Sequence, residues 1–235
     1  MTVPAKPTKP TKITYKFIFP DGESKSYDAL LDGVSGRWTS PPLPSAPQWT
    51  ELEHHKCSHC PLKSSEHPSC PVALNIAAVA DDFKTLKSTE RATVEVITAE
   101  RTYRKDLYLQ EGLFGLFGLI MATSDCPYLE FLRPMARFHL PFSSLRETMV
   151  RSVSFYLLRQ YFVAKNGGKP DYELIEFAKR YADLDAVNLG LANRLRSIIK
   201  ADVGANSIII LDGLAKLLSM QLASGLKDLE NIFAS

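Results

Sequence analysis

Apolar and polar residues alternate in two parts of the N-terminal half of the chain, and this period of two predicts β-strands. Residues 13–19 read ITYKFIF, and residues 20–23, PDGE, contain the proline and glycine of a tight turn. Residues 24–31 are therefore expected to return as the second strand of a hairpin. Residues 93–98 and 101–109 alternate in the same way and predict a second antiparallel pair.

Apolar residues recur every three or four positions in residues 71–86, and again through most of the C-terminal half, which predicts helices. Ser144 and Glu147 have the spacing of a capping box and should begin a helix that ends near Lys165, before the sequence NGG. Asp171 is expected to cap the next helix. The further predicted helices are residues 206–222, apolar on most sides and expected at the centre, and a short one after Gly225.

Together these elements predict an α+β fold, in which a small antiparallel β-sheet at the N-terminal end packs beside a C-terminal helical bundle. Residues 1–12 alternate proline with lysine and threonine and are expected to form a disordered tail. Residues 13–235 then form a single domain that is long enough to bury a core. Within this domain, residues 13–109 are the β-rich part with a Cys/His loop, and residues 110–235 are the helical part.

The charge balance excludes a strongly basic surface. The formal net charge is +2, and Lys6, Lys9 and Lys12 of the tail account for that excess. Nucleic-acid binding is therefore not expected. The N-terminus lacks the apolar stretch of a secretory signal, and the longest apolar run, residues 112–122, is too short to span a bilayer. We therefore expect a cytoplasmic protein without a membrane span, whose thiols stay reduced.

Cysteine and histidine are concentrated in one segment. Three of the four cysteines and four of the five histidines lie within His54–Cys70. The complete cysteine pattern is Cys57-x2-Cys60-x9-Cys70-x55-Cys126. Two thiols at x2 spacing can bind one centre from a single tight turn, and a fold can return a distant fourth cysteine to them. In a cytoplasmic protein this pattern predicts a metal site on all four cysteines.

The residues after the cysteines favour an iron–sulfur cluster over zinc. Cys60, Cys70 and Cys126 are each followed directly by proline. Cys-Pro recurs at the end of cluster-binding sequences, and proline restricts the residue before it to extended backbone, which stiffens a cage of thiolates. Structural zinc sites more often contain a second pair at x2 spacing, which is missing here. The sequence thus predicts a [4Fe-4S]-type cluster, with zinc as the alternative.

The loop histidines keep the zinc alternative open, because any one of them can replace a cysteine in a Cys₃His site. Taken singly, each is expected to be a solvated loop residue. These histidines are His54, His55, His59 and His67.

Three glycines precede Cys126 on the predicted helix. Gly112, Gly115 and Gly118, with Ala122, share one face of that helix. A face without large side chains lets another backbone segment, or a bulky inorganic cluster, approach closely.

His139 and five arginines are the second group of candidate residues. His139 lies between apolar residues, where a packed histidine with a backbone partner is expected; the alternatives are an acid–base group, a haem ligand or a support for the metal site. Arginine suits carboxylate or phosphate binding, but we expect these arginines to pair with the acids between Asp171 and Asp185 on the next helix. The five are Arg133, Arg137, Arg146, Arg151 and Arg159.

The sequences CSHCPL, CPVA, GLIMATSDCP and RPMARFHLPF resemble an uncharacterised family of bacterial proteins, a domain of unknown function. The resemblance extends from Ile13 to the C-terminal helix. It implies a bacterial source, and it implies that the four cysteines belong to one pattern. No reaction can be carried over from it.

The sequence supports three functional hypotheses. The first is a redox-sensing or electron-carrying protein with a cluster on the four cysteines. The second is a zinc-stapled interaction module without redox chemistry, whose helices or tail contact a protein partner. The third is a cluster-containing enzyme in which His139, Arg133 and Arg137 line a pocket. Because the sequence contains no Walker loop, no GxGxxG and no HExxH, it leaves open whether the protein is an enzyme.

Overall fold

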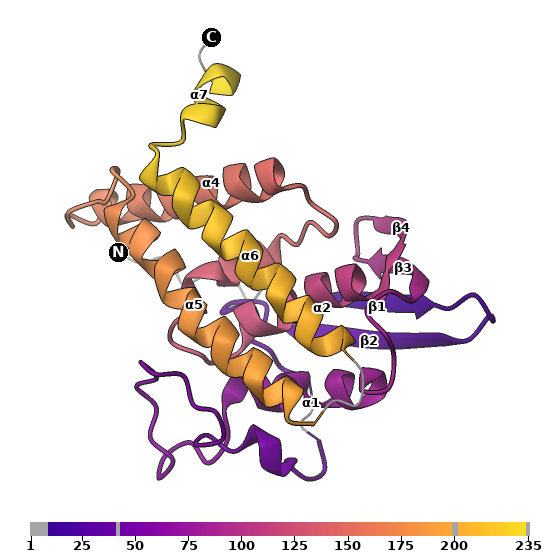
Figure 1. Cartoon of the computed structure of the whole chain (residues 1–235). Coiled ribbons are helices and arrows are strands. Elements are labelled where there is room, and N and C mark those ends of the chain that lie inside the picture. The colour runs from indigo at the N-terminus through magenta and orange to yellow at the C-terminus, as the bar shows by residue number, and fades with distance from the viewer. Residues whose placement is uncertain (1–8, 41–42, 199–201, 234–235) are drawn as a thin grey trace.

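The computed structural model describes residues 9–40, 43–198 and 202–233, and its fold is α+β (Figure 1). Four strands form one antiparallel sheet in the order β2-β1-β3-β4. The two predicted hairpins are confirmed as the pairs β1–β2 and β3–β4. The strands are β1 (Thr11–Ile18), β2 (Ser24–Leu31), β3 (Arg91–Ile97) and β4 (Thr102–Tyr108).

The central strand β1 shows why the alternation predicted the sheet. Ile13, Tyr15 and Phe17 are completely enclosed on one face, while the residues between them are partly exposed. Burying every second side chain of a strand is what gives a period of two. The strand begins at Thr11, so the last two residues of the predicted tail belong to the sheet. Residues 1–8 of that tail lie outside the described residues.

Helices cover the buried face of the sheet and extend away from it as a bundle. The Phe83 ring of α1 (Pro71–Phe83) packs on Phe17 with ring centroids 5.1 Å apart, and α2 (Leu109–Thr123) packs on the same face. Figure 1 shows α5 (Ile175–Arg196) and α6 (Val203–Ala223) side by side, with α4 (Leu145–Lys165) crossing behind them. The shorter helices are η1 (Gln48–Thr50), η2 (Glu130–Leu132), α3 (Arg133–Arg137) and α7 (Lys227–Phe233).

Two helix starts contain the caps that the sequence predicted. The Ser144 hydroxyl accepts a hydrogen bond from Glu147 N–H at 3.2 Å, and the Glu147 carboxylate accepts from Ser144 N–H at 2.8 Å. This reciprocal pair is a capping box. The Asp171 carboxylate accepts from Ile175 N–H and from Glu176 N–H, each at 3.0 Å. Asp171 therefore caps the helix through its side chain, as predicted, although the residue at the N-cap position is Leu174.

The glycine face of α2 lets other segments of the chain approach closely, as expected, and side chains of the sheet and of α6 contact it. A Cβ on Gly112 would meet the Phe17 ring at 2.8 Å, and one on Gly115 would meet the Tyr15 hydroxyl at 2.8 Å. A Cβ on Gly118 would lie 3.3 Å from Leu211 of α6. These glycines let the sheet and α6 approach α2 closely.

Helix α6 is less enclosed than its composition suggested. It packs on α5 and α2, but Ile209, Leu217 and Met220 are exposed. Among the described helices it is the one that is long and apolar enough to cross a membrane, and 39% of that stretch is buried inside the fold. Because part of it packs inside the fold, α6 gives no clear membrane span.

Candidate metal centre

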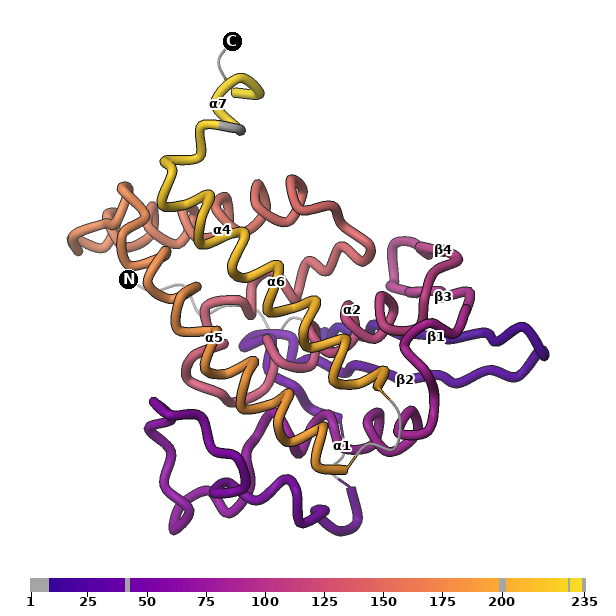
Figure 2. Tube along the Cα trace, viewed as in Figure 1, coloured from indigo at the N-terminus to yellow at the C-terminus, as the bar shows by residue number. Residues whose placement is uncertain are grey.

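The loop that contains three of the cysteines is closed at its base by backbone hydrogen bonds. It leaves η1 and returns to α1, and Figure 2 shows it beside the lower part of α5. Cys70 N–H donates to the Thr50 carbonyl at 2.7 Å, and Leu52 N–H donates to the Pro68 carbonyl at 2.8 Å. These bonds place Cys70 next to the segment that leads to Cys57.

The turn between the first two cysteines also contacts the segment of the fourth. Cys60 N–H donates to the Cys57 carbonyl at 3.0 Å, which closes the tight turn. The Tyr128 hydroxyl donates to the His59 carbonyl in this turn at 2.9 Å, and the two rings have centroids 3.9 Å apart. Because Tyr128 follows Cys126 by two residues, these contacts bring the fourth cysteine to the loop.

The two residues before Cys126 also contact other segments of the chain, which helps to fix the position of Cys126. The Asp125 carboxylate pairs with Arg37 at 3.1 Å. The Ser124 hydroxyl accepts a hydrogen bond from the Asn75 side chain at 3.0 Å. Asn75 belongs to α1, which begins directly after the third cysteine, so this bond ties the two cysteine segments together.

The four cysteines have free, partly buried thiols. Burial, with smaller contributions from the thiols of Cys70 and Cys60, raises the pKa of Cys57 to about 11. Burial likewise raises the pKa of Cys126 to about 12, with a contribution from Cys70 and Cys57. Thiols from three separate segments are therefore near enough to affect one another electrostatically.

These thiols do not form a ready-made coordination shell. Among the residues that the structure describes, no three Cys, His, Asp or Glu side chains are placed as a group that could hold a metal ion. The raised pKa values mean that the Cys57 and Cys126 thiols are protonated at neutral pH, whereas metal ligands are thiolates. Metal binding would therefore require the side chains to turn toward one point and to lose protons. Ligation by the four cysteines stays a prediction.

A buried arginine lies against this neighbourhood. Arg194 of α5 is 2% exposed, and its guanidinium donates to the carbonyls of Trp49, Glu51 and Leu52 at 2.7–2.8 Å. Within the described ranges no carboxylate forms an ion pair with it. Its positive charge lowers the pKa of Cys57, against the larger effect of burial. A buried cation without an anionic partner favours a negative group nearby, which a thiolate centre supplies.

Gly190 lets the Cys/His loop pack closely against α5. A Cβ on Gly190 would lie 2.9 Å from the Cys57 sulfur, which is closer than real Cβ atoms come, and 3.2 Å from the His55 carbonyl, which is a tight contact. Neither Gly190 nor Arg194 was among the predicted site residues. A single glycine inside a helical pattern is a signal of close packing and could have indicated Gly190. No local signal indicates Arg194.

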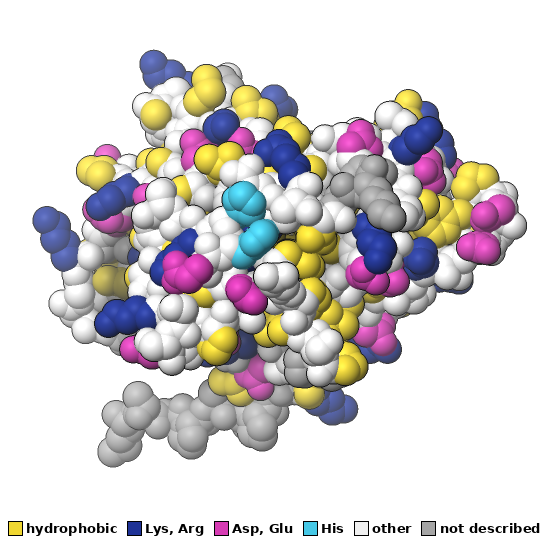
Figure 3. Space-filling model, turned by 60° about the horizontal axis from the view of Figure 1, so that its bottom comes forward, with side chains coloured by type: hydrophobic (Ala, Val, Ile, Leu, Met, Phe, Trp, Pro, Cys, Tyr) yellow, Lys and Arg dark blue, Asp and Glu magenta, His cyan; other side chains and the backbone are white. Residues whose placement is uncertain are grey.

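The loop histidines differ from one another. His55 and His67 are exposed, as predicted, and the His54 ring is 3.0 Å from the Ser197 hydroxyl. On the face shown in Figure 3, histidine side chains lie at the surface among acidic and basic side chains. His59 departs from the prediction, because both of its ring nitrogens are buried without a hydrogen-bond partner in the described chain. A buried imidazole without a partner is costly, so His59 is a further candidate ligand.

Residues 13–234 match the sequence model of a family described as a domain of unknown function (DUF6901). The chain belongs to this family. The match includes the sheet, the Cys/His loop and the helices, so all four cysteines lie inside the family's domain. No curated protein and no solved structure matches the chain.

His139 is packed, as predicted, but its partner is a side chain and not the backbone. Its Nε2 lies 2.6 Å from the Tyr15 hydroxyl oxygen. Burial, together with the positive charge of Arg151, lowers the pKa of His139 to about 3, so the ring is neutral at physiological pH. His139 lines a cavity to which none of the four cysteines contributes, which argues against a supporting role in the metal centre.

The arginines were expected to pair with acids of the next helix, and for Arg133 and Arg151 this is wrong. Arg133 pairs with Glu130 at 3.3 Å and with Asp125 at 3.8 Å, both of which are close to it in sequence. Arg151 donates to backbone carbonyls. The cavity that contains His139 is lined by Arg151, and neither Arg133 nor Arg137 lines it. The pocket of the enzyme hypothesis is therefore not built as predicted.

Proposed function

We propose that this chain is a cytoplasmic bacterial protein that holds a [4Fe-4S]-type cluster on Cys57, Cys60, Cys70 and Cys126 and serves in redox sensing or electron transfer. The observation that supports the proposal is that free thiols from three segments act on one another electrostatically, near the buried cation Arg194. Thiolate-bound iron and sulfide would supply reversible one-electron chemistry.

The surroundings of the thiols fit a negatively charged centre. Arg194 contributes a positive charge that carbonyls hold in place. Cys70 is the N-cap of α1, and the N-terminus of a helix favours negative charge. Cys70 also has the extended backbone that the following proline imposes, with φ −67° and ψ 120°. Cys57, Cys70 and Cys126 pack against the apolar core, which limits access of water to the centre.

Zinc is the second candidate, and His59 is the observation that favours it. This histidine lies between Cys57 and Cys60, and its buried ring nitrogens have no partner in the described chain. A neutral imidazole is a common zinc ligand, so one ring nitrogen could join three of the thiols in a Cys₃His site. The zinc would then crosslink the segments that contain its ligands, without redox chemistry, and the protein would act by binding another protein.

Elemental analysis after anaerobic purification tests these proposals. A [4Fe-4S] centre predicts about four iron and four sulfide per chain, with broad absorbance near 400 nm that oxygen bleaches. Cys126→Ala should lose the cluster, whereas His67→Ala, an exposed change in the same loop, should keep it. Colourless protein with about one zinc per chain would refute the cluster and support the staple. Protein without either element after reconstitution would refute both.

A further inference from the structure

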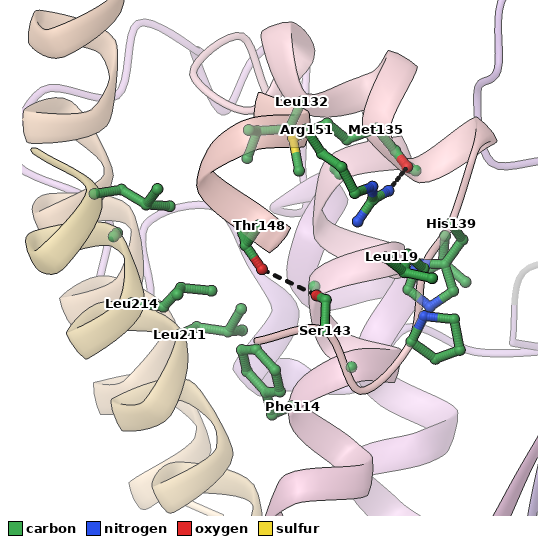
Figure 4. Close-up of a pocket in the computed structure, with 18 of the residues that line it drawn as sticks. Phe114, Leu119, Leu132, Met135, His139, Ser143, Thr148, Arg151, Leu211 and Leu214 are labelled. Atoms are coloured by element: carbon green, nitrogen blue, oxygen red, sulfur yellow. Dashed lines mark hydrogen bonds between the residues drawn. The ribbon is translucent and has the colours of Figure 1, made fainter. Parts of the chain in front are cut away.

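A separate cavity lies between α2, α3, α4 and α6, away from the four cysteines. Its volume is about 150 Å³. Figure 4 shows Leu132 and Met135 at the top of it, Leu119 on one side, Leu211 and Leu214 of α6 on the other, and Phe114 below, near Leu211. A dry cavity of about this size lined by apolar side chains is large enough to bind benzene.

One cation lies at this apolar cavity. Arg151 uses a single guanidinium nitrogen, Nη2, to donate to the carbonyls of Met135 at 3.1 Å and Phe138 at 2.6 Å. Its Nη1 and Nε form no hydrogen bond with residues of the described chain, and no carboxylate there lies within ion-pair distance of it, although the charge of Glu147 on the same helix acts on it from farther away. Arginine can hold a carboxylate through two parallel hydrogen bonds, so these free donors suit an anionic ligand.

The other polar groups at the cavity carry no charge. His139 is neutral and is bonded to Tyr15. The Ser143 and Thr148 hydroxyl oxygens are 2.9 Å apart and bond to each other, as Figure 4 shows. Arg151 is therefore the one charged side chain among the residues that line the cavity.

We propose that this cavity binds a small apolar carboxylic acid, with the carboxylate on Arg151 and the hydrocarbon part against the leucines of α2 and α6. A hydrophilic anion such as phosphate would have to be desolvated against apolar walls, which is unfavourable. A neutral or cationic molecule of the same size would leave the donors of Arg151 unused or would be repelled. This binding site is independent of the metal centre and of what the centre holds.

Benzoate and hexanoate are suitable probes, with hexan-1-ol and hexylamine as matched neutral and cationic molecules. The two acids should raise the melting temperature in proportion to the logarithm of their concentration, because a ligand of the folded state stabilises it by mass action. Benzoate protons should also show NMR contacts with the methyl groups of Leu211 and Leu214. Equal effects of all four probes, or contacts elsewhere on the protein, would overturn the proposal.

Two variants of α4 distinguish the role of the Arg151 charge in binding from the effect of removing any positive charge from this helix. Arg151→Gln should weaken acid binding by about tenfold to a hundredfold, as expected for loss of a charged hydrogen bond, and leave hexan-1-ol binding unchanged. Arg159→Gln removes an exposed charge from the same helix and should bind as the parent does. If both variants lose binding equally, the proposal is wrong. Because Arg151 also supports two backbone carbonyls, the NMR contacts in the parent protein remain decisive if that variant does not fold.

Discussion

Cys57 packs directly against Gly190, so its position depends on the absence of a side chain at that residue. Gly190→Ala would place a Cβ 2.9 Å from the Cys57 sulfur, so that the side chain or the loop must move. On an open helix, replacing glycine by alanine stabilises by about 0.5–1 kcal/mol. At Gly190 we expect the reverse: a lower melting temperature and a clear loss of bound metal, measured by calorimetry and elemental analysis.

Gly213 of α6 provides the matched control for this prediction. A Cβ on Gly213 would meet no atom within 4 Å, because the position is exposed. Gly213→Ala should therefore raise the melting temperature slightly and keep the full metal content. If Gly190→Ala behaved in the same way, the close approach of α5 to Cys57 would have no role in the site.

The buried His139 makes stability depend on pH. Burial and Arg151 lower its pKa to about 3 in the folded chain, whereas an unfolded histidine titrates near 6.5. Between these values the unfolded state binds a proton that the folded state does not. The free energy of unfolding should therefore fall as the pH decreases below 6.5, by at most about 1.4 kcal/mol for each pH unit. Urea denaturation at several pH values measures this slope.

His139→Gln removes the titrating group at this position and should flatten the slope between pH 6.5 and 4.5. His67→Gln is the control, because His67 is exposed in the loop and should leave the slope unchanged. Comparing each variant with the parent at the same pH cancels the contributions of the carboxyl groups. A slope that His139→Gln does not alter would mean that the ring gains its proton within the folded protein.

At the scale of elements, the sequence predicted those features that local patterns encode. Alternation identified the four strands because alternate side chains are buried, most fully in β1 and β3, and Ser144 with Glu147 identified the start of α4. The pairing of β1 with β3 was not predicted, since strand order depends on contacts between distant segments. The start of α5 was placed too early, because the cap residue Asp171 reaches backbone N–H groups four and five residues ahead.

Asp171 should be the most sensitive position at the start of α5. Its carboxylate accepts hydrogen bonds from two backbone N–H groups of that start and, at 2.8 Å, from the Tyr156 hydroxyl of α4. Asp171→Ala should lower the free energy of unfolding by about 1–2 kcal/mol, as loss of a helix cap does. Urea denaturation with an unchanged m-value would measure this loss. Glu173→Ala, an exposed change nearby, should have almost no effect, and an equal loss in both variants would contradict the capping role.

Across the whole molecule, the Cys/His loop joins the N-terminal part of the chain to a C-terminal helix. His54 contacts Ser197, and Arg194 bonds to the carbonyl of Leu52, across more than 140 residues of sequence. The spacing of the cysteines allowed the hypothesis of a shared site, because three of the four lie close together in the sequence. It could not predict the support from α5, since no pattern near Arg194 refers to a loop so far away in sequence.

Metal binding should therefore stabilise two distant segments together. Ligation would fix residues 57–70, and the loop in turn packs on Gly190 and Arg194 of α5. Because bound metal stabilises the state that holds it, removal by a chelator should increase hydrogen exchange in the loop and in the C-terminal half of α5. The strands β1 and β3 are central in the sheet and contain none of the proposed ligands, so they should keep their protection. Hydrogen exchange with mass spectrometry measures these changes. If exchange increased equally in the sheet, or increased in neither the loop nor α5, the centre would not connect the loop to α5.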